Sequence, residues 1–133
     1  MNKIFLRILC VSILLLVMTS AVLAEEIVPY SDEVFDILTA SLSSSKTVTF
    51  SCVAGATQKS IKMTNCWLQE KTGTSWRKVR SLEVPTTEAK NTVAYYAYMD
   101  YSDEIGSGTF RIGFTMNADG HAVTRYSNER TFD

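Results

Sequence analysis

The chain is poor in the residues that most often carry catalysis or metal binding. It has three cysteines, one histidine and two prolines in 133 residues. It contains no C-x-x-C and no G-x-S-x-G motif, and its histidine, His121, has no cysteine beside it. The usual sequence evidence for a redox pair, a zinc site or a serine hydrolase is therefore missing. We predict no cofactor and no metal site, and we favour a protein that is not an enzyme.

Positive charge is not in surplus either. The full chain has 13 basic and 14 acidic side chains, which gives a net charge of −1. Binding of nucleic acid or of anionic lipid by charge depends on an excess of lysine and arginine. The composition therefore predicts neither partner.

Residues 1–24 have the pattern of a secretory signal peptide. Lys3 and Arg7 give a positive start, and the apolar run over residues 8–17 is followed by small residues. We expect cleavage before Glu25, which leaves a secreted, extracellular protein of 109 residues with a net charge of −3. An uncleaved anchor is less favoured because the apolar run is short, and no later run is long enough to span a bilayer.

Cleavage would remove Cys10 and leave Cys52 and Cys66 in an oxidising compartment. We predict that these two cysteines form a disulfide. The bond would close a loop of about 15 residues and contribute roughly 3 kcal/mol on the chain-entropy model. Two free buried thiols are the alternative.

Apolar and polar residues alternate with a period of two from Thr47 onward. The alternation is clearest in Thr47–Cys52 and in Thr109–Met116, and it is typical of strands with one buried face. Similar runs predict seven strands: Leu38–Ser43, Thr47–Ala54, Ile61–Lys71, Trp76–Leu82, Thr92–Tyr101, Thr109–Met116 and Ala122–Thr131.

Turn residues separate these runs. Thr72–Thr74 predicts a hairpin turn, and Asp119-Gly120 predicts a tight turn with positive φ. Residues 25–37 form a lead-in, where Ser31 could cap a helical turn, although a strand entered directly fits better. Residues 38–133 then make one β-domain.

Seven strands with one apolar face each predict an all-β fold in which two antiparallel sheets pack face to face. The order Cys52, then Cys66-Trp67-Leu68-Gln69, then Gly108–Ile112 resembles that of immunoglobulin-like and fibronectin-type sandwiches. It departs from the antibody pattern because the sixth strand has Ile112 and Phe114 where a bridging cysteine would lie. The leader, the size and the tryptophan-containing hairpin are also similar to those of uncharacterised exported proteins of Gram-positive bacteria, a similarity that implies no activity.

Aromatic residues are the best candidates for ligand contacts. In an extended strand, Tyr96 and Tyr98 share a wet face, opposite Tyr95. If Cys66 points into the core, Trp67 points outward and joins the candidate surface. Rings on a wet sheet face can stack on sugars or hold a peptide, although cross-strand packing alone would also account for them.

Arg77 and Arg80, with Lys78 between them, make a local basic group in an acidic chain. This group could meet an anionic glycan or wall polymer, or it could be a charged edge that prevents strand aggregation.

These features favour a secreted, noncatalytic binding module that contacts a glycan or a protein at a cell surface. One rival is a small secreted hydrolase that uses His121 or the acidic group Asp100, Asp103 and Glu104. This acidic group could also hold calcium, but its spacing favours a solvated loop. A structural assembly component is the other rival, and fold alone cannot choose among the three.

Overall fold

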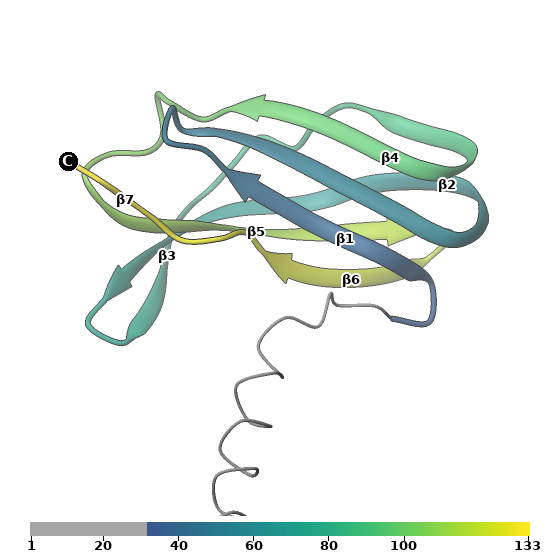
Figure 1. The fold of residues 1–133 in the computed structure, drawn as a ribbon, viewed down its shortest axis with the longest axis horizontal. Helices are drawn as coiled ribbons and strands as arrows, with labels where there is room; N and C mark the ends of the chain where they lie inside the picture. Colours follow the sequence, from purple (N-terminus) through teal and green to yellow (C-terminus); the bar gives the residue numbers. More distant parts are fainter. Residues whose placement is uncertain (1–31) are drawn as a thin grey trace, which may run out of the picture.

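The computed structural model describes residues 32–133, and the regular elements there are all β-strands. The predicted signal peptide and Ser31 lie outside the described residues. The seven strands are β1 (Phe35–Leu42), β2 (Thr47–Thr72), β3 (Ser75–Ser81), β4 (Glu88–Asp100), β5 (Gly108–Ala118), β6 (His121–Tyr126) and β7 (Arg130–Phe132) (Figure 1). The prediction of an all-β fold with antiparallel strands is confirmed.

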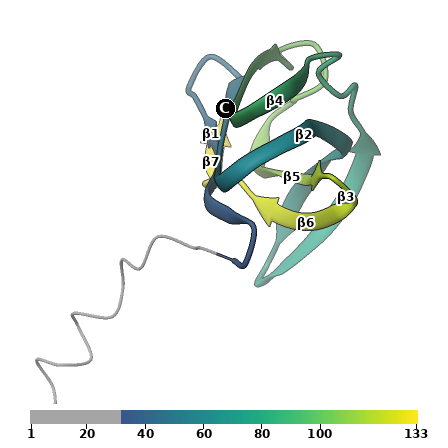
Figure 2. The same ribbon diagram turned by 90° about the vertical axis from the view of Figure 1, so that its right-hand side faces the viewer.

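The strands form one antiparallel sheet that curls over itself into a half-barrel (Figure 2). The long strand β2 takes part in both layers. Its first half pairs with β1 and with the second half of β4, whereas its second half pairs with the start of β4, with β3 and with β5. The expected division into two separate sheets is therefore not confirmed, because a single sheet supplies both layers.

The bend that allows this lies in the middle of β2. The register with β4 breaks between Val53 and Gln58, and Asn91 on β4 has a positive φ of 52°. A break of this kind bends a strand and increases its twist. The predicted strands at residues 47–54 and 61–71 are the two halves of β2 on either side of this bend.

The last predicted strand, residues 122–131, is two strands in the structure. Ser127 separates β6 from β7, and its hydroxyl accepts a hydrogen bond of 2.8 Å from the Ile112 amide. The next side chain, Asn128, accepts a hydrogen bond from the Leu42 amide (2.8 Å) and donates one to the Leu42 carbonyl (3.0 Å). These bonds tie the end of β1 to the connection between β6 and β7.

Both predicted turns are confirmed. Gly73 has a φ of 67° in the β2–β3 turn, and Asp119 and Gly120 have φ values of 49° and 90° in the β5–β6 turn. The chain also enters β1 directly, as favoured from the sequence. Asp32 accepts hydrogen bonds from the amides of Val34 and Phe35 just before the strand.

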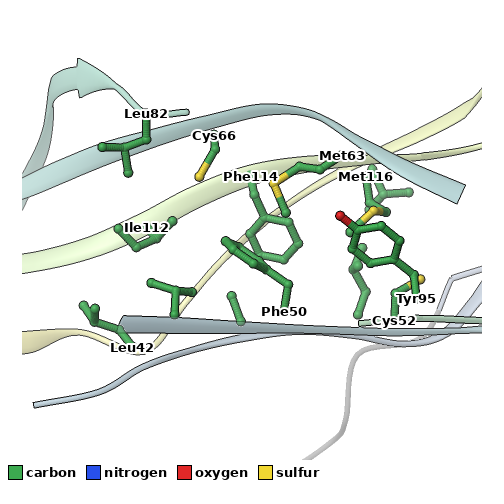
Figure 3. Packing of buried hydrophobic residues seen from close by; sticks show 14 of the residues in the cluster. Leu42, Phe50, Cys52, Met63, Cys66, Leu82, Tyr95, Ile112, Phe114 and Met116 are labelled. Atoms are coloured by element: carbon green, nitrogen blue, oxygen red, sulfur yellow. The ribbon is translucent and has the colours of Figure 1, made fainter. Parts of the chain in front are cut away.

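The core lies between the two layers. Phe50 on β2 and Phe114 on β5 meet at its centre, with ring centroids 5.2 Å apart and planes at 67°. Both side chains are fully buried, as the alternation predicted. Figure 3 shows the same division for the labelled side chains: Leu42, Phe50, Cys52 and Tyr95 extend from one layer toward Cys66, Phe114 and Met116 from the other.

Candidate binding surfaces

The first candidate surface is the outer face of the layer made by β1, the first half of β2 and the second half of β4. Tyr96 and Tyr98 project from β4 and are 62% and 65% exposed, while Tyr95 between the layers is 1% exposed. Strand alternation explains the difference, because successive side chains point to opposite faces. The predicted orientation of all three tyrosines is confirmed.

Hydroxyl groups surround the two exposed rings. Tyr96 lies opposite Ser51, and Tyr98 lies opposite Thr49. The same cross-strand rows continue onto β1, so that the face contains Tyr96, Ser51 and Thr39 in one row and Tyr98, Thr49 and Ser41 in the next. None of these six residues belongs to a charged type. We call this neutral, hydroxyl-rich surface the tyrosine face.

The second candidate surface lies on the opposite layer, on the outer face of β2, β3 and β5. The register places Trp67 opposite Gly113, and a Cβ atom added at Gly113 would overlap the indole ring. The indole therefore lies directly over the backbone of β5. Its edge meets the ring of Tyr126, with centroids 6.2 Å apart and planes at 85°.

A guanidinium group extends this arrangement. The Arg111 carbon Cζ lies 4.0 Å from the centroid of Tyr126 and 4.3 Å from that of Trp76. Its Nε donates a hydrogen bond of 2.7 Å to Oε1 of Gln69, which fixes the plane of the group. A guanidinium group in this position makes a favourable cation–π interaction with each of the two rings. We call Trp67, Tyr126, Arg111 and Trp76 the aromatic–cation stack.

A hollow of about 470 Å³ opens beside the stack. It lies where the edge of β2 passes from β4 to β3. Lys62 pairs with Glu88 and Trp67 with Ser81. Between them, the Cys66 carbonyl accepts a hydrogen bond of 2.9 Å from the Leu82 amide, whereas residues 63–65 have no partner strand on that side. A register break with β5 falls in the same stretch. The hollow is lined by Thr64, Asn65, Cys66, Trp67, Lys78, Ser81, Leu82 and Val84.

The structure does not bring the predicted binding residues together. Trp67 lies on the layer opposite to Tyr96 and Tyr98, because β2 bends between Cys52 and Cys66. Arg77 lies opposite Glu70 and Arg80 opposite Leu68. Residues opposite each other in a sheet point to the same side, so these two arginines point away from the outer face that holds Trp67. The five candidate residues Tyr96, Tyr98, Trp67, Arg77 and Arg80 therefore do not lie on one face of the sheet.

Sequence reasoning missed Gln69, Arg111 and Tyr126 as parts of a site. The available signal was a glycine on the outward side of a strand, since Gly113 shares its face with Arg111. A glycine within a strand often marks a close approach by another group. Here that group is Trp67.

The predicted disulfide between Cys52 and Cys66 is absent. Both cysteines are free, and both are buried. Cys52 lies beside Tyr95 in one layer, and Cys66 extends from the other layer; Figure 3 shows the rings of Phe50 and Phe114 between them. The sulfur of Cys66 is instead 3.5 Å from the hydroxyl of Tyr101. The bend in β2 separates the two cysteines and accounts for this correction.

The two thiols are expected to resist alkylation in the folded protein. Burial raises the pKa of Cys52 to about 12 and that of Cys66 to about 11. The thiolate is the reactive form, so at pH 8 iodoacetamide should label the native protein at least about a hundredfold more slowly than a free cysteine. After denaturation without reductant, mass spectrometry should find both thiols labelled. Labelling that requires reductant would contradict the unpaired state.

His121 belongs to a structural contact at the start of β1. Its Nε2 lies 2.8 Å from Oδ2 of Asp32, and its Nδ1 lies 3.5 Å from Oε1 of Glu33. Burial opposes ionisation of Asp32, but the hydrogen bonds from His121, Phe35 and Val34 outweigh it and lower the pKa of this carboxyl. The histidine thus ties the entry of β1 to the β5–β6 hairpin.

The acidic group proposed for the rival functions sits at the end of β4 and in the following loop. Asp100 and Asp103 are exposed and Glu104 is half-buried. The hydrogen bond with Ser102 lowers the pKa of Asp100. Within residues 32–133, no group of three or more histidine, cysteine, aspartate or glutamate side chains could hold a metal ion.

The same part of the chain has no helix with the length and apolar character needed to cross a membrane.

Comparison with known proteins does not assign the chain to a family. No protein-family model, no curated protein and no solved structure matches it.

Proposed function

We propose that this protein is a secreted, noncatalytic binding module that contacts a glycan at a cell surface through the tyrosine face. The observation that supports the proposal is the exposure of Tyr96 (62%) and Tyr98 (65%) side by side on one strand face. Their cross-strand neighbours, Ser51 and Thr49, are too short to cover an aromatic ring. Cross-strand packing therefore does not account for these rings, and a ligand would gain by covering them.

The chemistry of the face favours a sugar chain over other ligands. Two residues along a strand span about 7 Å, so the two phenol rings can contact successive parts of an extended ligand. Sugar rings offer apolar C–H faces to such rings and hydroxyls to the serine and threonine side chains around them. The face has no charged side chain in its two central rows. A neutral glycan segment matches it better than a charged peptide.

Export is part of the same proposal. The signal-peptide pattern of residues 1–24 supports it. The resemblance to immunoglobulin-like and fibronectin-type sandwiches, and to exported proteins of Gram-positive bacteria, agrees with a role outside the cell. In that reading the two halves of the curled sheet correspond to the two layers of a sandwich.

Neither rival has comparable support. His121 is engaged by Asp32 and Glu33 at the entry of β1, where it serves the fold. A hydrolase would be revealed by screening the purified protein against common hydrolase substrates and repeating the assay with His121→Ala. An assembly component would form a stable oligomer on a sizing column.

Alanine at Tyr96 or Tyr98 is expected to weaken glycan binding while leaving the fold intact. Each exposed ring should account for about tenfold in affinity, about 1.4 kcal/mol, and the double variant should fall below detection on a glycan array. Circular dichroism should be unchanged, because both side chains are exposed.

Tyr126→Ala is the matched control for this experiment. Tyr126 is 45% exposed on the opposite layer, so the variant should bind the same neutral glycans as the parent. If the parent binds no glycan, or if the double variant Tyr96→Ala/Tyr98→Ala binds as well as the parent, the proposal fails. Binding on a protein array alone would replace the glycan with a protein partner.

A further inference from the structure

We propose a second binding site in this protein: the hollow beside Trp67 binds an anionic saccharide, with its acidic group facing Lys78. The site goes beyond the function proposed above, because it lies on the other layer and takes a charged ligand. Carboxylated and sulfated sugars share the required chemistry.

The shape of the hollow suits a small ligand. Its volume of about 470 Å³ lies within the range of about 300–1,000 Å³ typical of small-molecule sites. The lining includes both kinds of group that a sugar needs. Leu82 and Val84 supply apolar surface, and Thr64, Asn65 and Ser81 supply hydroxyl and amide groups for hydrogen bonds.

The charged residue in the lining of the hollow is a lysine that forms no ion pair. Lys78 lines the hollow, and no carboxylate of residues 32–133 lies within ion-pair distance of it. Lys71, on the same outer face, is by contrast paired with Glu129 at 3.4 Å. Glu83 lies between two lining residues in sequence but does not itself line the hollow. An exposed, unpaired ammonium in an acidic chain attracts an anion to this position.

Trp67, which contributes to the lining of the hollow, is already held in place before any ligand arrives. Trp67 lies over Gly113 on one side and meets Tyr126 at its edge. The guanidinium of Arg111 in turn contacts the rings of both Tyr126 and Trp76. Because the stack already restrains the indole, binding does not have to order it, and that loss of entropy is avoided. The stack therefore supports the hollow as a preformed site.

The test is a titration of the purified protein with three probes: oligogalacturonate, which is carboxylated, a chondroitin sulfate oligosaccharide, which is sulfated, and a cello-oligosaccharide, which is neutral. Calorimetry should show binding of at least one acidic probe at the hollow and none of the neutral probe there. Lys78→Gln should weaken that binding about tenfold, as expected for a charge-assisted hydrogen bond. Added salt should weaken it as well. The acidic probe that binds identifies the acidic group.

Arg80→Gln is the matched control, since Arg80 lies two residues from Lys78 but points to the other side of the hairpin. It should change the affinity by less than about twofold. The inference is overturned if neither acidic probe binds, or if Arg80→Gln weakens binding as much as Lys78→Gln does. The double variant Tyr96→Ala/Tyr98→Ala should keep full binding of the acidic probe. Loss of that binding would place the ligand on the tyrosine face and overturn the second site without affecting the first proposal.

Discussion

Phe114→Ala is expected to lower the free energy of unfolding by about 3–5 kcal/mol, as measured by urea denaturation followed by tryptophan fluorescence. Phe114 is fully buried and packs edge-on against Phe50 at 5.2 Å, where the two layers meet. Removing the ring leaves a cavity between the two layers. The curled sheet cannot close this cavity without a change in the register of β5. Domains of this size have a total stability of about 5–15 kcal/mol, so the loss is a large fraction of it.

Two further variants keep the result interpretable if the alanine variant does not fold. Phe114→Leu retains most of the volume and should cost less than the alanine variant, while Tyr98→Ala should change stability by less than about 0.5 kcal/mol because its ring is exposed. A double-mutant cycle with Phe50→Ala should give a coupling of about 0.5–1.5 kcal/mol. Equal effects of Phe114→Ala and Tyr98→Ala would contradict the placement of the core.

The alternation of the sequence predicted the strands well but could not reveal how they share a sheet. Residues 55–60, Gly-Ala-Thr-Gln-Lys-Ser, are small or polar and read as a loop between two strands. In the structure they continue β2 through its bend, where the half-barrel leaves them largely exposed. An exposed, bent strand has no apolar period, so a local pattern cannot distinguish it from a loop.

The orientation of single residues was predictable where the strand is regular. Tyr96 and Tyr98 follow the alternation of β4 without interruption, and their exposure was predicted. On β3, the register with β2 skips Val79, because Gln69 pairs with Lys78 and Leu68 with Arg80. This extra residue changes the phase of the strand. Simple alternation would place Arg80 on the same side as Lys78, but the extra residue places it on the opposite side.

The aromatic–cation stack depends on pairing between distant strands, which no local pattern contains. Arg111 reaches Trp76 only because β2 lies between β5 and β3, with Gln69 paired to both. The disulfide prediction had the same weakness. It followed from the expected oxidising compartment and from the number of cysteines. Neither observation gives information about the bend in β2 that separates Cys52 from Cys66.

Gly113→Ala is expected to destabilise the protein by about 1–3 kcal/mol and to displace the indole of Trp67. The added methyl group would occupy the space that the ring now fills, and the ring cannot simply rotate away because Tyr126 meets its edge. Urea denaturation measures the loss, and the indole N–H resonance of Trp67 in an NMR spectrum should shift. Affinity for acidic saccharides at the hollow should fall in the same variant, since Trp67 forms part of its wall.

Gly106→Ala is the matched control, because a Cβ atom there meets nothing within 4 Å and the residue has no positive φ. It should be neutral, or stabilising by about 0.4–1 kcal/mol through the lower entropy of the unfolded chain. The decisive comparison is Gly113→Ala in a Trp67→Ala background, where the overlap is gone and the substitution should cost nothing. A similar loss in both backgrounds would show that the glycine is needed for the backbone of β5 and not for the indole above it.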